Sequence, residues 1–393
     1  MDIAPRIDPD QAGRCDVNLN PPRNANERLD WLRLTRSENV GPATFFSLLS
    51  RFGSAAAALE AVPALARRGG ASRQPRVMSV ADGTREMAAL EAVGARLIAQ
   101  GEAEYPLRLA AIDSAPPMIT VSGDSSLLAR DQLAMVGGRN ASAAGVRLAR
   151  ELASALGQSG LVITSGLARG IDAAAHQGAL ETGTVGVIAG GIDNVYPSEN
   201  RTLYDALKSR GLIVTEMPFG TAPQARHFPR RNRIISGLAL AVLVVEAAER
   251  SGSLITARFA LEQGRDVLAV PGSPLDPRAR GANRLIQSGA TLVQGAEDVL
   301  DALGPLQQAS NVLRDPVRSH LPYEDVAALD DAAIEAVRRQ LTALISPVPV
   351  EVDELVRQTG QPPALVQAAL LELELAGRVT RVSGQRVCVS VSE

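Results

Sequence analysis

A short run of arginines around one phenylalanine is the part of the sequence whose residue types most directly suggest chemistry. Four arginines lie within residues 226–233, and no acidic residue occurs between Glu216 and Glu246. Guanidinium groups pair with phosphates while an aromatic ring stacks on a base, which is how many proteins hold a single nucleic-acid strand. The alternative is a solvated helix face, but the run leads directly into a pair of isoleucines. We therefore predict a DNA-binding role for Phe228, Arg230, Arg231, Asn232 and Arg233.

Two glycine-rich turns, each placed before a helix start, have the composition of anion sites. Glycines let the backbone approach a ligand closely, and the free N–H groups and dipole of a helix start attract negative charge. The first turn spans residues 136–142 and the second spans residues 164–172, and each includes one arginine. The alternative is a tight turn without a ligand. The residues predicted to bind here are Gly137, Gly138, Arg139, Ser142, Ser165, Gly166, Arg169 and Gly170.

Two further segments add a stacking candidate and another helix start. Tyr196 follows a third glycine-containing turn, where stacking on a base and packing under the loop are equal alternatives. Ser251, Gly252 and Ser253 open a helix with N–H and hydroxyl donors. Several such helix starts together with the arginines suggest a ligand with several phosphates, and a polynucleotide is one such ligand.

The turns recur within a regular alternation of short apolar runs and helical stretches. Continuous apolar runs are typical of strands buried on both faces of a parallel sheet, and ligands bind outside the carboxyl ends of such strands. The expected fold class is α/β, with a Rossmann-like doubly wound parallel sheet over residues 101–303. We expect strands at residues 133–136, 161–164, 185–188, 212–215, 240–246, 267–270 and 291–293, with helices starting near residues 142, 171, 197, 228, 253 and 282.

Smaller modules are expected on both sides of this sheet. Residues 1–24 are polar and are predicted to be a disordered tail, and residues 25–100 a small helical domain similar to SAM or helix-hairpin-helix modules. The hairpin at residues 39–44 is a weak phosphate-binding candidate or a plain helix corner. Residues 304–326 are predicted to be a linker, and residues 327–393 a winged-helix domain with its hairpin turn at Ser383-Gly384.

The expected recognition helix of this winged helix has the wrong charge for reading DNA. It spans roughly residues 363–376, contains Glu372 and Glu374, and lies in a stretch without basic residues between Arg357 and Arg378. Reading base edges needs Arg, Lys, Asn or Gln side chains. We therefore predict a protein-contact or regulatory role for this domain, although arginines in the wing leave weak phosphate contacts open.

The composition excludes several classes of protein. The net charge of the 393 residues is −3, the longest apolar run is far shorter than the roughly 20 residues of a membrane span, and the two cysteines and three histidines are scattered. Lys208 is the only lysine, so there is no P-loop. Asp172 and His176 lie on one helix face and could form an acid–base pair, but local structural bonds are the favoured interpretation. We expect a cytoplasmic protein without catalytic residues, metal, cofactor or membrane association.

Taken in order, the motifs resemble those of the DNA-processing protein A family, also called Smf. The similarity rests on residues 136–139, 165–172, 196–200, 228–235, 251–257, 270–272 and 281–290, and covers about residues 105–303. It implies a homodimer that binds incoming single-stranded DNA in natural transformation, protects it and helps load the RecA recombinase. The family pocket maps onto Gly137, Gly138, Arg139, Ser165, Gly166, Arg169, Arg231, Asn232 and Arg233. Gly138 and Ala189 depart from the common family residues, which affects fine geometry rather than charge.

Two other functions compete with this interpretation. A Rossmann-type nucleotide phosphoribohydrolase has similar glycine turns, but this chain lacks the glutamate that closes that family's Pro-Gly-Gly motif. A winged-helix transcriptional regulator would need a basic recognition helix. A dinucleotide dehydrogenase is disfavoured because no Gly-x-Gly-x-x-Gly follows the first expected strand.

Overall fold

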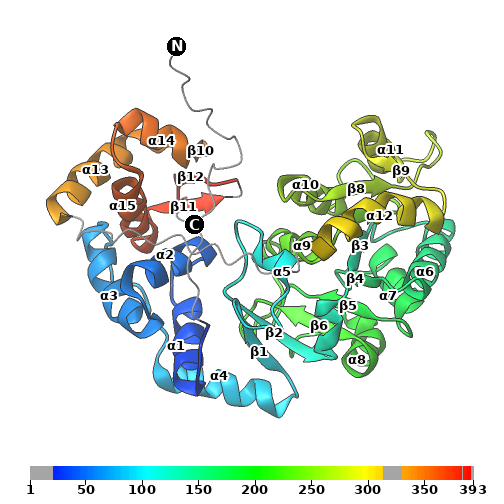
Figure 1. Ribbon diagram of the computed structural model, residues 1–393, viewed down its shortest axis with the longest axis horizontal. Coiled ribbons are helices and arrows are strands. Elements are labelled where there is room, and N and C mark those ends of the chain that lie inside the picture. The colour runs from blue at the N-terminus through cyan, green and yellow to red at the C-terminus, as the bar shows by residue number, and fades with distance from the viewer. Residues whose placement is uncertain (1–20, 313–329, 383, 391–393) are drawn as a thin grey trace.

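A nine-stranded sheet is the centre of the computed structural model, which describes residues 21–312, 330–382 and 384–390. The tail at residues 1–20, most of the expected linker and Ser383 of the expected wing turn lie outside the described residues. The strands run in the spatial order β1-β2-β6-β5-β4-β3-β7-β8-β9 (Figure 1). Their bounds are β1 Arg96–Ala99, β2 Met118–Gly123, β3 Gln132–Val136, β4 Val162–Ser165, β5 Thr184–Val187, β6 Leu212–Thr215, β7 Ala241–Val244, β8 Asp266–Ala269 and β9 Thr291–Leu292.

The strands from β3 to β9 pair in parallel, and the chain changes direction across the sheet at β3. From β3 the chain builds outward through β4, β5 and β6, then returns to the other side of β3 and continues through β7, β8 and β9. This is the doubly wound arrangement, so the predicted fold class is confirmed and all seven expected strands are present. The switch point, where ligands bind in many such folds, lies between the carboxyl ends of β3 and β7.

Alternating side chains give the parallel sheet two apolar faces. Leu133 and Met135 of β3 pack with helices on one side, and Ala134 and Val136 pack with helices on the other. The first face is covered by α6 Ala143–Gln158, α7 Ile171–Ala179, α8 Arg201–Arg210 and α12 Ala296–Val312. The second face is covered by α5 Leu107–Ala110, α9 His227–Leu238, α10 Ser253–Glu262 and α11 Arg280–Gln287. Because α12 continues to Val312, residues 304–312 are helical and not part of a linker.

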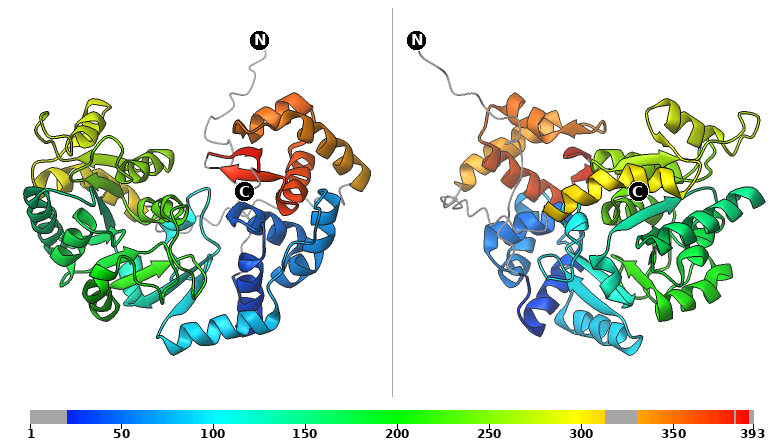
Figure 2. Two further views of the ribbon diagram at one scale, coloured as in Figure 1. Left: turned by 180° about the vertical axis from the view of Figure 1, so that it is seen from behind. Right: turned by 45° about the vertical axis from the view of Figure 1, so that its right-hand side comes forward.

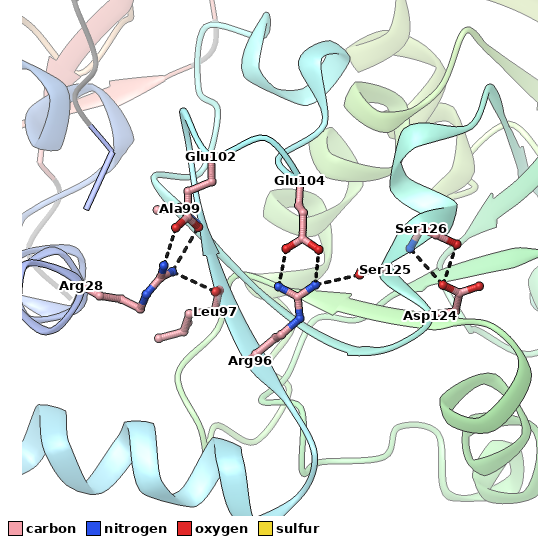
Figure 3. Close-up of polar contacts among 9 residues, drawn as sticks. All are labelled: Arg28, Arg96, Leu97, Ala99, Glu102, Glu104, Asp124, Ser125 and Ser126. Atoms are coloured by element: carbon pink, nitrogen blue, oxygen red, sulfur yellow. Dashed lines mark hydrogen bonds and ion pairs between the residues drawn. The ribbon is translucent and has the colours of Figure 1, made fainter. Parts of the chain in front are cut away.

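Two strands that the sequence analysis missed form one edge of the sheet. β2 pairs antiparallel with β6, and β1 pairs antiparallel with β2, so the parallel sheet has an antiparallel margin. The boundary expected at residue 100 therefore assigns β1 to the wrong side. Figure 3 shows how this margin is tied to the first helix: the Arg28 guanidinium donates to the Glu102 carboxylate and, over 3.1 Å, to the Leu97 carbonyl oxygen.

Four helices precede the sheet, and the winged helix lies on them. The helices are α1 Ala25–Arg36, α2 Pro42–Phe52, α3 Ala55–Arg68 and α4 Val80–Ala92. The winged helix contains α13 Asp331–Leu344, α14 Val352–Thr359, α15 Pro363–Leu375 and the strands β10 Val350–Glu351, β11 Val379–Val382 and β12 Arg386–Val389. Figures 1 and 2 show the winged helix seated on α2 and α3 on one side of the molecule, with the sheet on the other.

Among the described residues, no single helix is long and apolar enough to cross a membrane. The bent pair of α2 and α3, whose directions differ by 107°, meets the length and composition test only when both helices are taken together.

His176 of α7 is a buried member of the sheet–helix interface. Its Nδ1 lies 2.7 Å from the hydroxyl of Thr184, and this hydroxyl donates its own proton to the Ile163 carbonyl oxygen. His176 must therefore donate from Nδ1, while Nε2 has no hydrogen-bond partner among the described residues. Burial lowers the pKa of His176 to about 3, with a smaller contribution from Arg231, so the ring is neutral at physiological pH. The structure thus favours the structural role expected for this histidine.

We expect His176→Asn to flatten the acid dependence of stability. An unfolded histidine takes up a proton near pH 6.5 while the folded one does not, so folding stability is lost as the pH falls from 6.5 toward 3. This coupling costs the wild type about 2 kcal/mol between pH 7.5 and 5.0. Urea unfolding at both pH values measures it, and the partly exposed His227, changed to Asn, is the control. Equal losses in wild type and His176→Asn would contradict the assignment.

Candidate nucleic-acid interface

A small hollow lies at the carboxyl ends of β4 and β5, beside the start of α9. Loops after both strands and the first turns of α9 contribute to its wall. It therefore lies at the carboxyl ends of the strands, where the sequence predicted the site. It is displaced from the switch point between β3 and β7. Its lining residues are Gly166, Ile188, Ala189, Gly190, Asn194, Tyr196, Pro223, Phe228 and Arg231.

Arg231 supplies a buried positive charge at this hollow. Only 6% of its surface is exposed, and its Nη1 donates to the Val187 carbonyl oxygen at 2.9 Å. Burial lowers its pKa to about 10, against the opposite effect of Asp172, and Arg139 lowers it further. The guanidinium remains protonated at neutral pH. Its Nε has no hydrogen-bond partner among the described residues, so one donor of this cation is unused.

The turn after β4 is shaped around this guanidinium. A side chain on Gly166 would place its Cβ 1.8 Å from Arg231 Nη1 and 2.7 Å from Asp172 Oδ2, so a larger residue would displace the Arg231 guanidinium and the Asp172 carboxylate. Asp172, at the start of α7, accepts the Ala168 N–H at 3.4 Å, and burial raises its pKa while Arg231 opposes that shift. Asp172 thus compensates the Arg231 charge and completes a helix start, which supports the structural interpretation of this residue.

Two aromatic rings and an arginine form the rim. The Arg139 guanidinium carbon lies 5.1 Å from the centre of the Phe228 ring, within the range of a cation–π contact. The Tyr196 ring lies 5.5 Å from the Phe228 ring at an angle of 51°, and 48% of Tyr196 is exposed. Tyr196 therefore packs against a neighbour and also presents an open face to solvent.

The two glycine turns pack against each other and bring their arginines to adjoining loops. Gly170 has φ +75°, and a Cβ there would lie 2.3 Å from the Gly138 carbonyl oxygen. Arg139 and Arg169 are both exposed, and Arg169 pairs loosely with Glu199 at 3.7 Å. The structure thus brings Arg139, Arg169 and Arg231 to one edge of the sheet.

Several other predicted residues serve the fold instead. The carboxylate of Glu216 pairs with both Arg233 and Arg230 and neutralises part of their charge. These two arginines therefore lie on a different face of α9 from Arg231. Ser165 donates to the Met135 carbonyl oxygen at 2.6 Å, and Asn232 donates to the Gly252 carbonyl oxygen at 3.4 Å. These bonds engage the named groups within the fold, and their part in DNA binding stays a prediction.

The switch point itself is occupied by a carboxylate that the sequence analysis missed. Glu246 Oε1 accepts the Ser142 N–H at 2.9 Å, and Oε2 accepts the Ser142 hydroxyl at 2.6 Å. The carbonyl oxygen of Glu246 also accepts the Gly138 N–H at 2.6 Å. These groups at the start of α6 were the predicted anion donors. Likewise, the hydroxyls of Ser251 and Ser253 lie 2.7 Å apart and bond each other. The sequence did offer a signal for this pairing, because Glu246 is an acidic residue that follows β7 closely and so lies near the first glycine turn.

We expect Glu246→Ala to open an anion site at the start of α6. Removing the carboxylate frees the N–H and hydroxyl of Ser142, which then attract phosphate. Phosphate binding, measured by isothermal titration calorimetry, should become at least tenfold tighter than in wild type. The exposed Glu249, changed to Ala, makes the same change in net charge and should have no such effect. Equal phosphate affinity in both variants would contradict the role given to Glu246.

Comparisons with known proteins agree with this architecture. The model of the DNA recombination-mediator protein A family matches residues 96–304. The DprA-like N-terminal HHH domain matches residues 25–89, and the DprA winged helix domain matches residues 324–385. Protein Smf of Escherichia coli is 40% identical over 75% of this chain and 78% of its own length, and DNA processing protein DprA of Bacillus subtilis is 44% identical over 56% and 75%.

Solved structures show the same relationship. DNA processing protein A from Streptococcus pneumoniae has a TM-score of 0.59 and 34% identity, covering 71% of this chain and 98% of its own. DNA processing protein A from Helicobacter pylori, described for its single-stranded DNA binding mode, has a TM-score of 0.50 and 25% identity, covering 55% and 96%. The resemblance found in the motifs is confirmed: the chain belongs to the DNA recombination-mediator protein A family.

Proposed function

We propose that this chain binds single-stranded DNA at the hollow beside α9 and handles it without catalysing a reaction. One observation carries the proposal: the buried Arg231 cation lies at an open hollow whose rim is formed by Arg139, Phe228 and Tyr196. The Helicobacter pylori relative, whose description names single-stranded DNA binding, supports the same ligand.

The arrangement suits an unpaired strand better than a duplex. Stacking on Phe228 or Tyr196 requires a base whose face is free, and a duplex keeps its bases stacked on one another. The exposed guanidinium groups of Arg139 and Arg169 meet the backbone phosphates, while Arg231 offers a fixed charge to the group that enters the hollow. Binding of this kind depends strongly on salt and weakly on sequence.

The residues around the hollow support binding rather than catalysis. His176 is buried and neutral and uses Nδ1 within the core, and Asp172 compensates Arg231, so these two groups are engaged in the fold. At the switch point, where a nucleotide hydrolase would hold its phosphate, Glu246 presents a negative charge. A nucleotide phosphoribohydrolase is therefore the less favoured function. A transcriptional regulator is also disfavoured, because α15, at the position that reads DNA in other winged helices, packs against α3 and α2.

The wider role in this proposal follows the family. The chain would act in the cytoplasm as a homodimer, protect incoming single strands during natural transformation, and help load the RecA recombinase. The family description as a recombination mediator supports this assignment. The recombinase contact and the dimer surface are separate parts of the proposal, and the DNA site does not depend on them.

We expect Arg139→Ala and Arg169→Ala each to reduce the salt dependence of single-strand binding. Each lost phosphate contact should lower the slope of log affinity against log salt by roughly 0.7. The slope is measured by fluorescence anisotropy of a labelled oligonucleotide at salt concentrations from roughly 50 to roughly 300 mM, which bracket the physiological value. The control is Arg210→Ala. Arg210 is also exposed and pairs with Glu181, but it lies at the amino ends of the strands, away from the hollow. Slopes that match the control in both variants would refute the site.

We expect Phe228→Leu to weaken single-strand binding without changing the salt slope. A stacked base contributes about 1–3 kcal/mol, which corresponds to roughly a 5- to 150-fold loss of affinity. Phe259 also carries an arginine over its ring, at 5.7 Å, so Phe259→Leu removes a comparable aromatic group from α10. If both variants lose the same affinity, Phe228 does not stack on DNA.

A further inference from the structure

The helix α15 of the winged helix is buried on two sides. Val366, Leu370 and Leu373 pack in the core of the winged helix itself. Leu371 and Leu375 instead join the apolar cluster of the N-terminal helices. A helix with apolar residues on two faces needs a partner on each, and here the second partner is formed by α2 and α3 (Figure 2).

The contact between α15 and α3 is close and has specific polar bonds. A Cβ on Gly69 would lie 1.9 Å from the Glu372 carbonyl oxygen, so glycine at the end of α3 permits the approach. Asn39, in the hairpin between α1 and α2, donates its side-chain amide to the Leu375 carbonyl oxygen at 3.0 Å. The helix position that reads DNA in other winged helices is therefore covered by this chain's own helices.

Polar and charged groups of the N-terminal helices meet the two glutamates of α15, which also pair with Arg338 and Arg381 of the winged helix. Arg68 Nε lies 3.0 Å from Glu372 Oε1, and the Thr44 hydroxyl donates to Glu374 Oε2 at 2.7 Å. Both glutamates are at least 95% buried. Burial lowers the pKa of Arg51, at the end of α2, and Arg68 lowers it further, while the nearby Glu372 charge opposes this shift. The two glutamates whose charge is unfavourable for binding DNA are thus the residues through which α15 docks on the N-terminal helices.

The polar part of this contact is incompletely satisfied. Arg51 Nη1, Arg68 Nε and Glu372 Oε1 are buried, and none has an aligned hydrogen bond among the described residues. Arg68 Nε and Glu372 Oε1 are close but poorly aligned. Permanent cores leave few such groups unpaired, whereas surfaces that exchange partners are more polar and less optimised.

We propose that the face formed by Thr44, Arg51 and Arg68 is a docking surface for acidic amphipathic helices. In this structure α15 occupies the surface from within the same chain. A partner protein binds there when α15 leaves, through a helix with two carboxylates two residues apart and leucines four residues apart, as in Glu372, Glu374, Leu371 and Leu375. The spare donors of Arg51 and Arg68 give such a partner bonds that α15 leaves unmade.

The test uses the full-length chain and a fluorescent peptide with the sequence of residues 363–376. Leu371→Arg places a charge in the N-terminal apolar cluster and should release α15, because Leu371 does not belong to the winged-helix core. A tethered α15 competes at a millimolar effective concentration, so its release should tighten peptide binding at least tenfold over wild type. Leu344→Arg, at an exposed position on α13, is the matched control and should behave as wild type.

Two further measurements define the surface. Adding Arg68→Glu to the Leu371→Arg chain should abolish the gain, and a peptide carrying Glu372→Lys and Glu374→Lys should not bind. In the wild-type chain, saturating peptide should increase amide hydrogen exchange in α15 because the peptide displaces it. This last measurement decides the matter even if the Leu371→Arg chain does not fold.

Three results would overturn the proposal. The first is a released α15, shown by its hydrogen exchange, without any gain in peptide binding. The second is an α15 that stays protected in the wild-type chain at saturating peptide. The third is a Leu371→Arg chain that gains affinity for duplex oligonucleotides instead of the peptide, since the surface would then serve DNA.

Discussion

The buried guanidinium of Arg231 is the constraint around which the functional edge of the sheet is arranged. A charge removed from water needs an opposite charge and hydrogen-bond acceptors nearby, or it destabilises the fold. Asp172 and the Val187 carbonyl oxygen meet this need, and glycine at position 166 makes the room. The turns after β4 and β5 are therefore fixed by one side chain. The result is a rigid positive charge beside an open hollow, which a flexible surface arginine would not supply.

Much of the fold could be predicted because burial leaves a direct mark on the sequence. Strands covered on both faces must be apolar throughout, and all seven central strands were visible in this way. β1 and β2 were missed because they pair antiparallel and precede the regular alternation of strands and helices that begins at β3. The docking of α15 also had a signal, since a helix with leucines on two faces buries only one of them within its own domain. What it packs against could not be predicted, because Gly69 and Thr44 lie about 300 positions away in the chain.

The site was predictable in position but not in the direction of its side chains. Glycines before helix starts pointed to the correct edge of the sheet. On α9, however, Arg230 and Arg233 are three residues apart and share a face that meets Glu216, while Arg231 points to the hollow. Three of the four arginines in this run therefore divide into one buried cation at the site and two that pair with Glu216. Only the placement of Glu216 after β6 decides this division, and sequence spacing does not report it.

Three carboxylates determine where this chain can accept an anion. Glu216 pairs with two arginines of α9, Glu246 fills the start of α6, and Glu372 lies against the arginines of the N-terminal helices. Each position has the donors of an anion site, and each is already occupied from within the chain. Around the hollow, no described carboxylate forms an ion pair with Arg139. Arg169 pairs only loosely with Glu199, at 3.7 Å. A net charge of −3 therefore says little about the ligand, because the acidic residues close the competing sites and leave the positive field concentrated beside Arg231.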